Sequence, residues 1–347
     1  IRRCRNSSFI SPAMPLVLLL TFSASIIECT MNMDSTGIGT TNRTSYLLDY
    51  DAVKTVTKTV ADNDDSFYRM DKLFGARSKN DGAWHNYRTI STFSSTCNAG
   101  ISKLYGYLGL ESSTNAYGCN GLTEVTDMLF SVKYTISNKL LAESDLRSYY
   151  TGSDGEFIYR NNYVLPIGYA INEKSTLHMN LSSSNNGIEN QNILIQTMTG
   201  ISDIFSFVDE FPTQSECTIT PSKNGHLYLT VENKTIDYIT VSINGSERSF
   251  GCSNLKNNNH IIDVGYVNAT DRVDVTADSG MNLTAYMLDT DKFIEAYNQI
   301  NSESYQVDSF TETDFKGTIS LSSDKTVLFS IPYDGGWCVI SDRVSFG

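Results

Sequence analysis

The feature that most constrains this chain is an uncharged stretch near its start. Between Arg5 and Glu28 lie 22 residues without a formal charge, and the part from Leu16 to Leu20 is the most apolar. About 20 such residues are enough for a helix to span a hydrocarbon core of about 30 Å. Arginines precede the stretch and acidic residues follow it, so the positive-inside rule places residue 1 in the cytoplasm and everything after about Met33 outside. The sequence therefore predicts a transmembrane helix followed by an extracytoplasmic chain.

A secretory signal peptide is the alternative interpretation of the same stretch, because it also joins a basic start to an apolar core. The residues from Ile26 to Cys29, Ile-Ile-Glu-Cys, fit neither a small-x-small cleavage site nor a lipoprotein box. A retained helix is therefore favoured. Under either interpretation the remaining chain lies outside the cytoplasm.

The charge of the chain argues against one class of partner, and its cysteines argue against a metal site and a complete disulfide framework. The net charge is −13, from 39 acidic and 26 basic residues, which disfavours nucleic acid because its phosphates require a basic footprint. The seven cysteines show no metal-ligand spacing, and their odd number prevents a complete disulfide framework within the chain. Cys97 with Cys119, and Cys217 with Cys252, can pair in an oxidising compartment. The alternative is that these are small buried thiols.

The residue pattern changes once along the chain, and this predicts an α+β protein of three parts. Residues 1–33 form the transmembrane helix with its basic cytoplasmic flank. Residues 34–212 interleave helical spacing, at 51–60, 99–108 and 125–130, with short strands at 67–70, 132–136, 157–159 and 165–169, as in a mixed α/β domain. Residues 213–347 have mostly period-two alternation and predict an antiparallel β-sandwich, jelly-roll-like and truncated at its end, with one helix at 291–300.

Several strands of the predicted sandwich can be placed individually. Alternation marks residues 227–231, 239–243, 273–275, 283–285, 319–321 and 327–331, and Asn244-Gly245 is a hairpin turn signal. After the last strand, Pro332 ends the ladder because it has no N–H to donate, and Gly335-Gly336 permits a turn. Trp337 is then expected to be buried in the final hairpin of the domain.

No catalytic set can be assigned from the residues. His85 with Asp81 and Ser94 lacks a nucleophile elbow, and the four histidines, at 85, 178, 226 and 260, show no i, i+4 metal spacing. One basic concentration stands out and is interleaved with aromatic residues: Arg69, Lys72, Arg77, Lys79, Trp84, His85, Tyr87 and Arg88. Aromatic rings and guanidinium groups suit stacking on sugars and pairing with phosphate. The alternative is a loop that packs on the domain below it.

Seven short motifs, in order, resemble the extracytoplasmic portion of the bacterial YfhO family of polytopic membrane proteins over roughly residues 13–347. They are the runs at 67–72, 80–82, 91–95, 129–134, 161–168, 191–200 and 331–337, the last reading Ile-Pro-Tyr-Asp-Gly-Gly-Trp. The resemblance implies a multi-span membrane glycosyltransferase in the bacterial cell membrane. It also implies that residues 9–27 are a late transmembrane helix and that the bulk of this chain is extracytoplasmic.

The same resemblance implies a chemistry that this chain does not itself carry. Such enzymes take sugar from a polyprenyl-phosphate donor and add it to lipoteichoic acid or another cell-envelope polymer. A synthase for the polyprenyl-phosphate sugar and a flippase are expected partners, besides membrane lipid. The family's catalytic acids lie on loops between early transmembrane helices that this chain lacks, so no catalytic residue and no cofactor of its own are assigned. The basic segment is expected to bind the polymer acceptor.

A non-enzymatic protein is the alternative class: a membrane-anchored β-sandwich module that binds glycan or a partner protein. The reading frame upstream of Ile1 separates the two classes. Further hydrophobic spans with an acidic first outer loop support the transferase, whereas a start codon just before Ile1 supports the anchored module.

Overall fold

The computed structural model describes residues 13–35, 47, 49–73, 79–141, 143–172, 180–232, 236–251 and 261–340. Its contacts divide the chain into two compact units, residues 1–49 and residues 50–347. The first unit contributes the helix α1 (Ala13–Ser35), whose 23 residues have a mean hydropathy of 1.7 over the best window and no buried side chain. By length and composition α1 can cross a membrane, a test that a signal sequence also passes.

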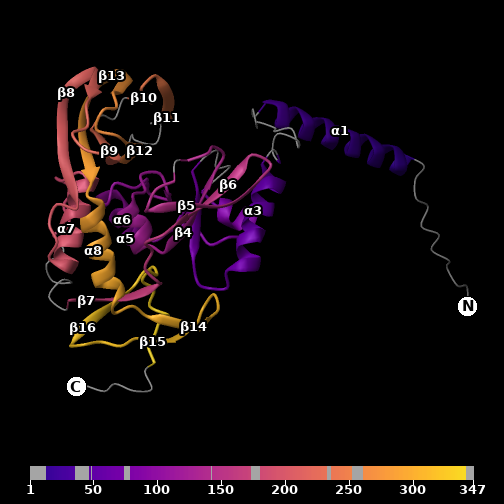
Figure 1. Cartoon of the computed structure of the whole chain (residues 1–347). Helices are drawn as coiled ribbons and strands as arrows, with labels where there is room; N and C mark the ends of the chain where they lie inside the picture. The colour runs from indigo at the N-terminus through magenta and orange to yellow at the C-terminus, as the bar shows by residue number, and fades with distance from the viewer. Residues whose placement is uncertain are drawn as a thin grey trace, which may run out of the picture. The chain divides into compact units, whose positions relative to one another are not determined.

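A four-stranded sheet organises the first part of the second unit (Figure 1). Its order is β1 (Arg69–Lys72), β4 (Val132–Ser137), β6 (Glu156–Asn161) and β5 (Arg147–Ser153), with β1 and β4 parallel and the other pairs antiparallel. Helix α3 (Tyr50–Asn63) covers one face and buries Val53, Val56 and Val60 against the sheet. The predicted helical spacing at 51–60 is confirmed because those valines form its buried stripe.

The remaining helices of the second unit are short. They are α4 (Asp81–His85), α5 (Ala99–Tyr107), α6 (Glu124–Leu129), α7 (Gly187–Thr199) and α8 (Thr290–Asn301), with the small strands β2 (Thr92–Phe93), β3 (Ala116–Tyr117) and β7 (Gly168–Asn172) between them. Of these, α6 packs on β4 of this sheet while α4 contacts α3. The α7 helix begins with a capping box between Asn186 and Glu189 and ends at Gly200 with φ +83°. The largest apolar cluster joins α5, α6, α7 and α8.

An antiparallel six-stranded sheet forms most of the second part. Its strands are β8 (Phe205–Ile219), β9 (Gly225–Glu232), β10 (Tyr238–Ile243), β11 (Ser246–Gly251), β12 (Ile261–Val267) and β13 (Val273–Leu288). The long strand β13 pairs with β8 along one edge, and with β10 and then β9 along the other. The two predicted strands at 273–275 and 283–285 are therefore one strand. Asn244 and Gly245 make the predicted β10–β11 turn with φ of 50° and 89°.

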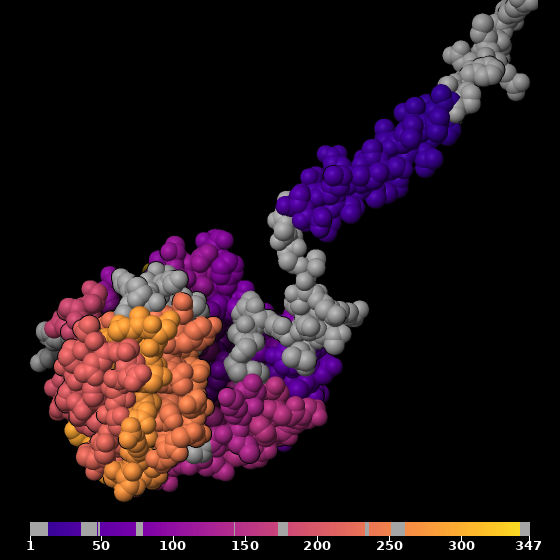
Figure 2. Space-filling model, turned by 90° about the horizontal axis from the view of Figure 1, so that it is seen from above, coloured from indigo at the N-terminus to yellow at the C-terminus, as the bar shows by residue number. Residues whose placement is uncertain are grey.

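The six-stranded sheet curls, and this explains the sandwich-like alternation of its sequence. The register of β13 shifts between Thr276 and Met281, where the strand passes from β10 to β9. Side chains from both halves, such as Val241 and Leu229, enter one shared core. Irregular positions of this kind let one strand contribute to two layers. The α+β class is confirmed, and in Figure 2 the red to orange atoms of the six-stranded sheet lie beside the magenta atoms of the region that contains β5 and β6.

The C-terminal strands do not join the six-stranded sheet, which corrects the prediction for this region. Strand β16 (Lys325–Phe329) pairs with β7, so the predicted strand at 327–331 belongs beside residues 168–172. Strands β14 (Gln306–Phe310) and β15 (Phe315–Thr318) form a separate hairpin, and residues 319–321 are not a strand. Trp337 is 42% exposed rather than buried. Alternation identified β16 correctly, but alternation carries no information on the partner strand.

A buried ionic cluster links the two sheets. Arg147 on β5 lies 3.2 Å from Glu124 and 3.9 Å from Asp127, both on α6, and Glu124 lies 3.9 Å from His226 on β9. Asn161 on β6 donates a hydrogen bond to Asp127 at 3.0 Å. Burial, followed by the charge of Glu124, raises the pKa of Asp127. The cluster thus fixes α6 between β5 and the six-stranded sheet through charges that have little access to water.

Candidate functional site

The predicted basic segment is mostly integrated into the fold. Lys72 is 4% exposed and its ammonium lies 2.9 Å from Asp81. Lys79 is paired with Glu111, which also accepts a hydrogen bond from Asn120 at 2.6 Å. These two lysines hold α4 and the following loops against the sheet.

The aromatic members of the predicted segment are divided between the interior and the surface. His85 is 3% exposed and lies between the rings of Tyr50 and Tyr87, at centroid distances of 5.5 and 6.4 Å. Trp84 contacts the ring of Tyr50 as well, at 5.3 Å in an edge contact, but is 38% exposed. Arg77 lies outside the described residues. The structure therefore does not gather the eight predicted residues on one surface.

Asp71 lies between these residues in the sequence and occupies the opposite face of β1 from Lys72. Its carboxylate accepts hydrogen bonds from Thr89 at 2.5 Å, Ser91 at 3.0 Å and the backbone N–H of Ile90 at 3.2 Å. Burial raises its pKa to about 6, against an ordinary value of 3.8, and the hydrogen bonds only partly counter this effect. The nearby Cys119 is a free thiol, as is Cys97, so of the two alternatives for these cysteines the structure shows the unpaired one. Cys217 is free, and Cys252 lies outside the described residues.

Arg69 and Arg88 are placed at the end of the sheet where β1 begins. Arg69 donates hydrogen bonds of 2.6 Å to the carbonyls of Phe130 and Ser330, and so ties β1 to the chain after β16. Burial lowers its pKa. Both guanidinium groups lie over the ring of Phe67, that of Arg69 at 5.2 Å and that of Arg88 at 5.7 Å.

Around Arg88 the structure assembles a group of rings, which we call the Arg88 cluster and define as Phe67, Arg88, Phe310, Phe315 and Trp337. The guanidinium of Arg88 also lies 5.0 Å from the ring of Phe310. Phe310 and Phe315, at the two sides of the β14–β15 turn, stack at 6.0 Å, and Trp337 lies 6.5 Å from Phe315.

Two members of the Arg88 cluster are open to solvent. The side chain of Arg88 is 39% exposed, and Trp337 is 42% exposed. Arg88 pairs at 3.0 Å with Glu312, whose own side chain is 81% exposed. Such a surface pair is weak, worth about 0.2–1 kcal/mol. An anionic ligand can therefore replace Glu312 at little cost, with rings on either side for the apolar faces of a sugar.

The sequence identified Arg88 but not its aromatic partners. Phe310 and Phe315 flank a four-residue polar stretch, Thr-Glu-Thr-Asp, which is a hairpin signal that could have placed them opposite each other. Their contact with Phe67 crosses more than 240 residues of chain, and no local pattern encodes it.

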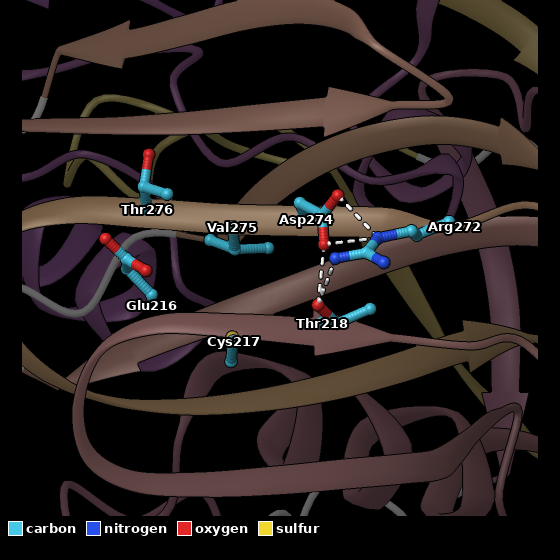
Figure 3. A pocket seen from close by; sticks show the side chains of 7 residues that line it. All are labelled: Glu216, Cys217, Thr218, Arg272, Asp274, Val275 and Thr276. Carbon is cyan, nitrogen blue, oxygen red and sulfur yellow. Dashed lines mark hydrogen bonds and ion pairs between the residues drawn. The ribbon is translucent and has the colours of Figure 1, made fainter.

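A second surface feature lies on β8 and β13, in the depression shown in Figure 3 and lined by Glu216, Cys217, Thr218, Arg272, Asp274, Val275 and Thr276. Arg272 donates to Asp274 at 2.8 Å, and Asp274 also accepts from Thr218 at 2.6 Å. Arg272 and Asp274 neutralise each other, and Glu216 adds a negative charge, which does not suit an anionic ligand. The depression is therefore a poorer candidate than the Arg88 cluster.

Comparison with known families decides the class of this protein. The family model described as bacterial membrane protein YfhO matches residues 6–216 and 208–345. The chain belongs to the YfhO family. No curated protein and no solved structure matches it. Membership of the YfhO family makes this a membrane protein, in agreement with the apolar helix α1, and the motif run at 331–337 follows the strand β16 that closes onto β7.

Proposed function

We propose that this chain is the acceptor-positioning portion of a polytopic membrane glycosyltransferase. The complete enzyme would transfer sugar from a polyprenyl-phosphate donor to lipoteichoic acid or another cell-envelope polymer on the extracytoplasmic face of the bacterial membrane. Membership of the YfhO family supports the membrane part of this proposal. The catalytic groups belong to parts of the enzyme outside this chain, and the synthase and flippase that deliver the donor are its expected partners.

The observation that carries the proposal is the Arg88 cluster. A teichoic polymer alternates phosphate groups with sugar or polyol units. A partly exposed guanidinium that rests on two rings, in a cluster that also holds an exposed Trp, offers a charge for the phosphate and apolar faces for the sugar. Of the predicted acceptor-binding residues, Arg88 combines exposure with a weak and replaceable partner.

The role proposed for the cluster is orientation of a long acceptor rather than chemistry on it. The lipid-linked donor keeps the reacting carbon at the membrane, so contacts made elsewhere on the polymer act by holding the acceptor in a productive position. The net charge of −13 opposes a polyanionic acceptor, and a local arginine reduces that repulsion where the polymer touches.

The test uses the complete membrane protein in living cells, with polymer glycosylation measured by NMR of the extracted polymer. We expect Arg88→Gln to lower the glycosylated fraction at limiting expression about tenfold or more, since a hydrogen bond to a charged group is worth roughly 1.5–3 kcal/mol. Trp337→Ala should lower it less. Arg272→Gln is the matched control, because this exposed arginine also pairs with a carboxylate but lies on the six-stranded sheet.

Unchanged glycosylation in Arg88→Gln, at equal protein level in the membrane, would refute the assignment of this cluster. Deletion of the whole protein has a separate meaning. If deletion leaves every envelope polymer glycosylated as before, the anchored binding module replaces the transferase as the better interpretation.

A further inference from the structure

The end of the four-stranded sheet opposite the Arg88 cluster carries exposed apolar side chains. Strands β1 and β4 are parallel, so their carboxyl ends lie at the same edge, where the N–H of Leu73 donates to the carbonyl of Ile136 at 2.9 Å. Leu73 directly follows β1 and is 45% exposed. Leu140, in the turn after β4, is 74% exposed. Two large leucines therefore face solvent at one edge of the sheet.

Trp84 and Tyr50 belong to the same edge. The ion pair between Lys72, the last residue of β1, and Asp81 brings α4 to it, and α4 carries Trp84. Tyr50 is the first residue of α3 and touches the Trp84 ring. The other end of α3 lies near the start of β4, because Asp64 there is 2.6 Å from Lys133. We call Tyr50, Leu73, Trp84 and Leu140 the apolar edge.

The chain itself connects this edge to the membrane segment. Only 14 residues separate Ser35, the end of α1, from Tyr50. A linker of this length keeps the apolar edge at a high local concentration, on the order of millimolar, near any bilayer that holds α1. A surface with weak intrinsic affinity for lipid is then sufficient for a stable contact.

We propose that the apolar edge binds the interfacial region of the lipid bilayer in which α1 is embedded. Trp and Tyr favour the headgroup level because their rings are apolar and their N–H and O–H groups stay hydrated, and leucines add apolar area below them. The charges near the apolar edge are mixed: Lys54 and Lys139 are positive, and Asp49 and Asp51 are negative. The contact should therefore depend mainly on apolar burial and only weakly on salt.

The two tryptophans of the chain allow a direct comparison, because their contacts lead to opposite ends of β1. Trp84 belongs to the apolar edge. Trp337 contacts Phe315, which touches Phe67 just before β1 begins. Figure 1 shows the β14–β15 hairpin at the bottom of the second unit and the start of α3 above it, at the right.

The experiment reconstitutes the full chain in vesicles of phosphatidylethanolamine and phosphatidylglycerol, and confirms flotation with the lipid. Trp337→Phe leaves Trp84 as the fluorophore, and Trp84→Phe leaves Trp337. Lipids brominated near the headgroup should quench Trp84 several-fold more strongly than Trp337. Adding Leu140→Ser to the Trp84 reporter should reduce the quenching, whereas Leu321→Ser, at a leucine that is 40% exposed elsewhere, should not.

Equal quenching of the two tryptophans, absence of quenching of Trp84, or failure of the chain to float with lipid would each overturn the proposal. The measurement involves no glycosyl transfer, so its failure leaves the proposed acceptor role standing. Conversely, Arg88→Gln should leave the quenching of Trp84 unchanged even if it abolishes glycosylation.

Discussion

Replacing Arg147 by Met tests the view that the buried ionic cluster joins the two sheets. The side chains involved are almost inaccessible: Arg147 is 11% exposed, Glu124 3% and Asp127 4%. Burial opposes the charge of Arg147, but the carboxylates, Glu124 above all, outweigh burial and raise its pKa. Methionine fills a similar volume and removes the charge, so the variant leaves two buried carboxylates facing each other.

The expected cost follows from that geometry. Breaking a buried ion pair by removing one partner costs about 3–5 kcal/mol, because the remaining charge is uncompensated. With a urea m-value of about 1–3 kcal/mol per M, the unfolding midpoint should fall by at least roughly 1 M. The loss should shrink at acidic pH. Burial already raises the pKa of Asp127, and Arg147 counters this effect, so without Arg147 that pKa rises further. A raised carboxyl pKa favours the folded state at low pH and penalises it as pH increases.

The assay is equilibrium urea unfolding of the full chain in detergent micelles, followed by near-ultraviolet circular dichroism, at pH 5 and pH 7.5. Arg147→Met with Glu124→Gln should recover a large part of the loss, since it restores the charge balance. Arg272→Met is the control, because that arginine is exposed and paired on the surface, and it should change little. A loss below about 1 kcal/mol, or one equal at both pH values, would show that the cluster does not stabilise the junction as argued.

Two further predictions concern the sites around β1 and α7. In the wild type the pKa of Asp71 is raised from 3.8 to about 6. Its contribution to folding stability is therefore fully present below pH 3.8 and is lost as the pH rises through 6, a change of about 3 kcal/mol. Asp71→Asn removes this pH dependence, so relative to the wild type it should be more stabilising at neutral pH than in acid. Urea titrations from pH 4 to 7.5 measure this difference, and parallel curves for the two proteins would contradict it. Gly109→Ala should cost about 2–4 kcal/mol, because φ is +76° and the new Cβ would lie 2.6 Å from Ile261. Gly155 has φ +87° but no atom within 4 Å of the added Cβ, so Gly155→Ala introduces backbone strain without a steric clash. It should therefore lower the free energy of unfolding clearly less than Gly109→Ala.

Local patterns predicted the elements of this fold well where burial is one-sided. The valines of α3 and the alternation of β10 gave correct elements because each has one face toward a core. The α7 helix was not predicted, since its buried side includes Asn190 and Gln191, which donate to the carbonyls of Tyr107 and Leu108. Its capping box and Gly200 were the available signals.

The site was harder to predict than the fold because charge pairing is a tertiary property. Lys72 and Lys79 look like members of a basic surface in the sequence, yet Asp81 and Glu111 neutralise them in the structure. Arg88 meets its carboxylate partner 224 residues later in the chain. Composition and spacing could indicate the residue types that suit a glycan, but not which of them would remain exposed.

The pairing of β16 with β7 has a consequence for how the protein is made. Lys325 is the partner of Asn172, so about 150 residues must be synthesised after β7 before its partner strand exists. At 5–20 residues per second this interval is roughly 8–30 s. During that time β7 presents unpaired backbone groups, which are a template for pairing with the wrong chain. The nascent protein therefore passes through a period in which a chaperone, or early burial of β7 beneath α7, is what protects it from aggregation.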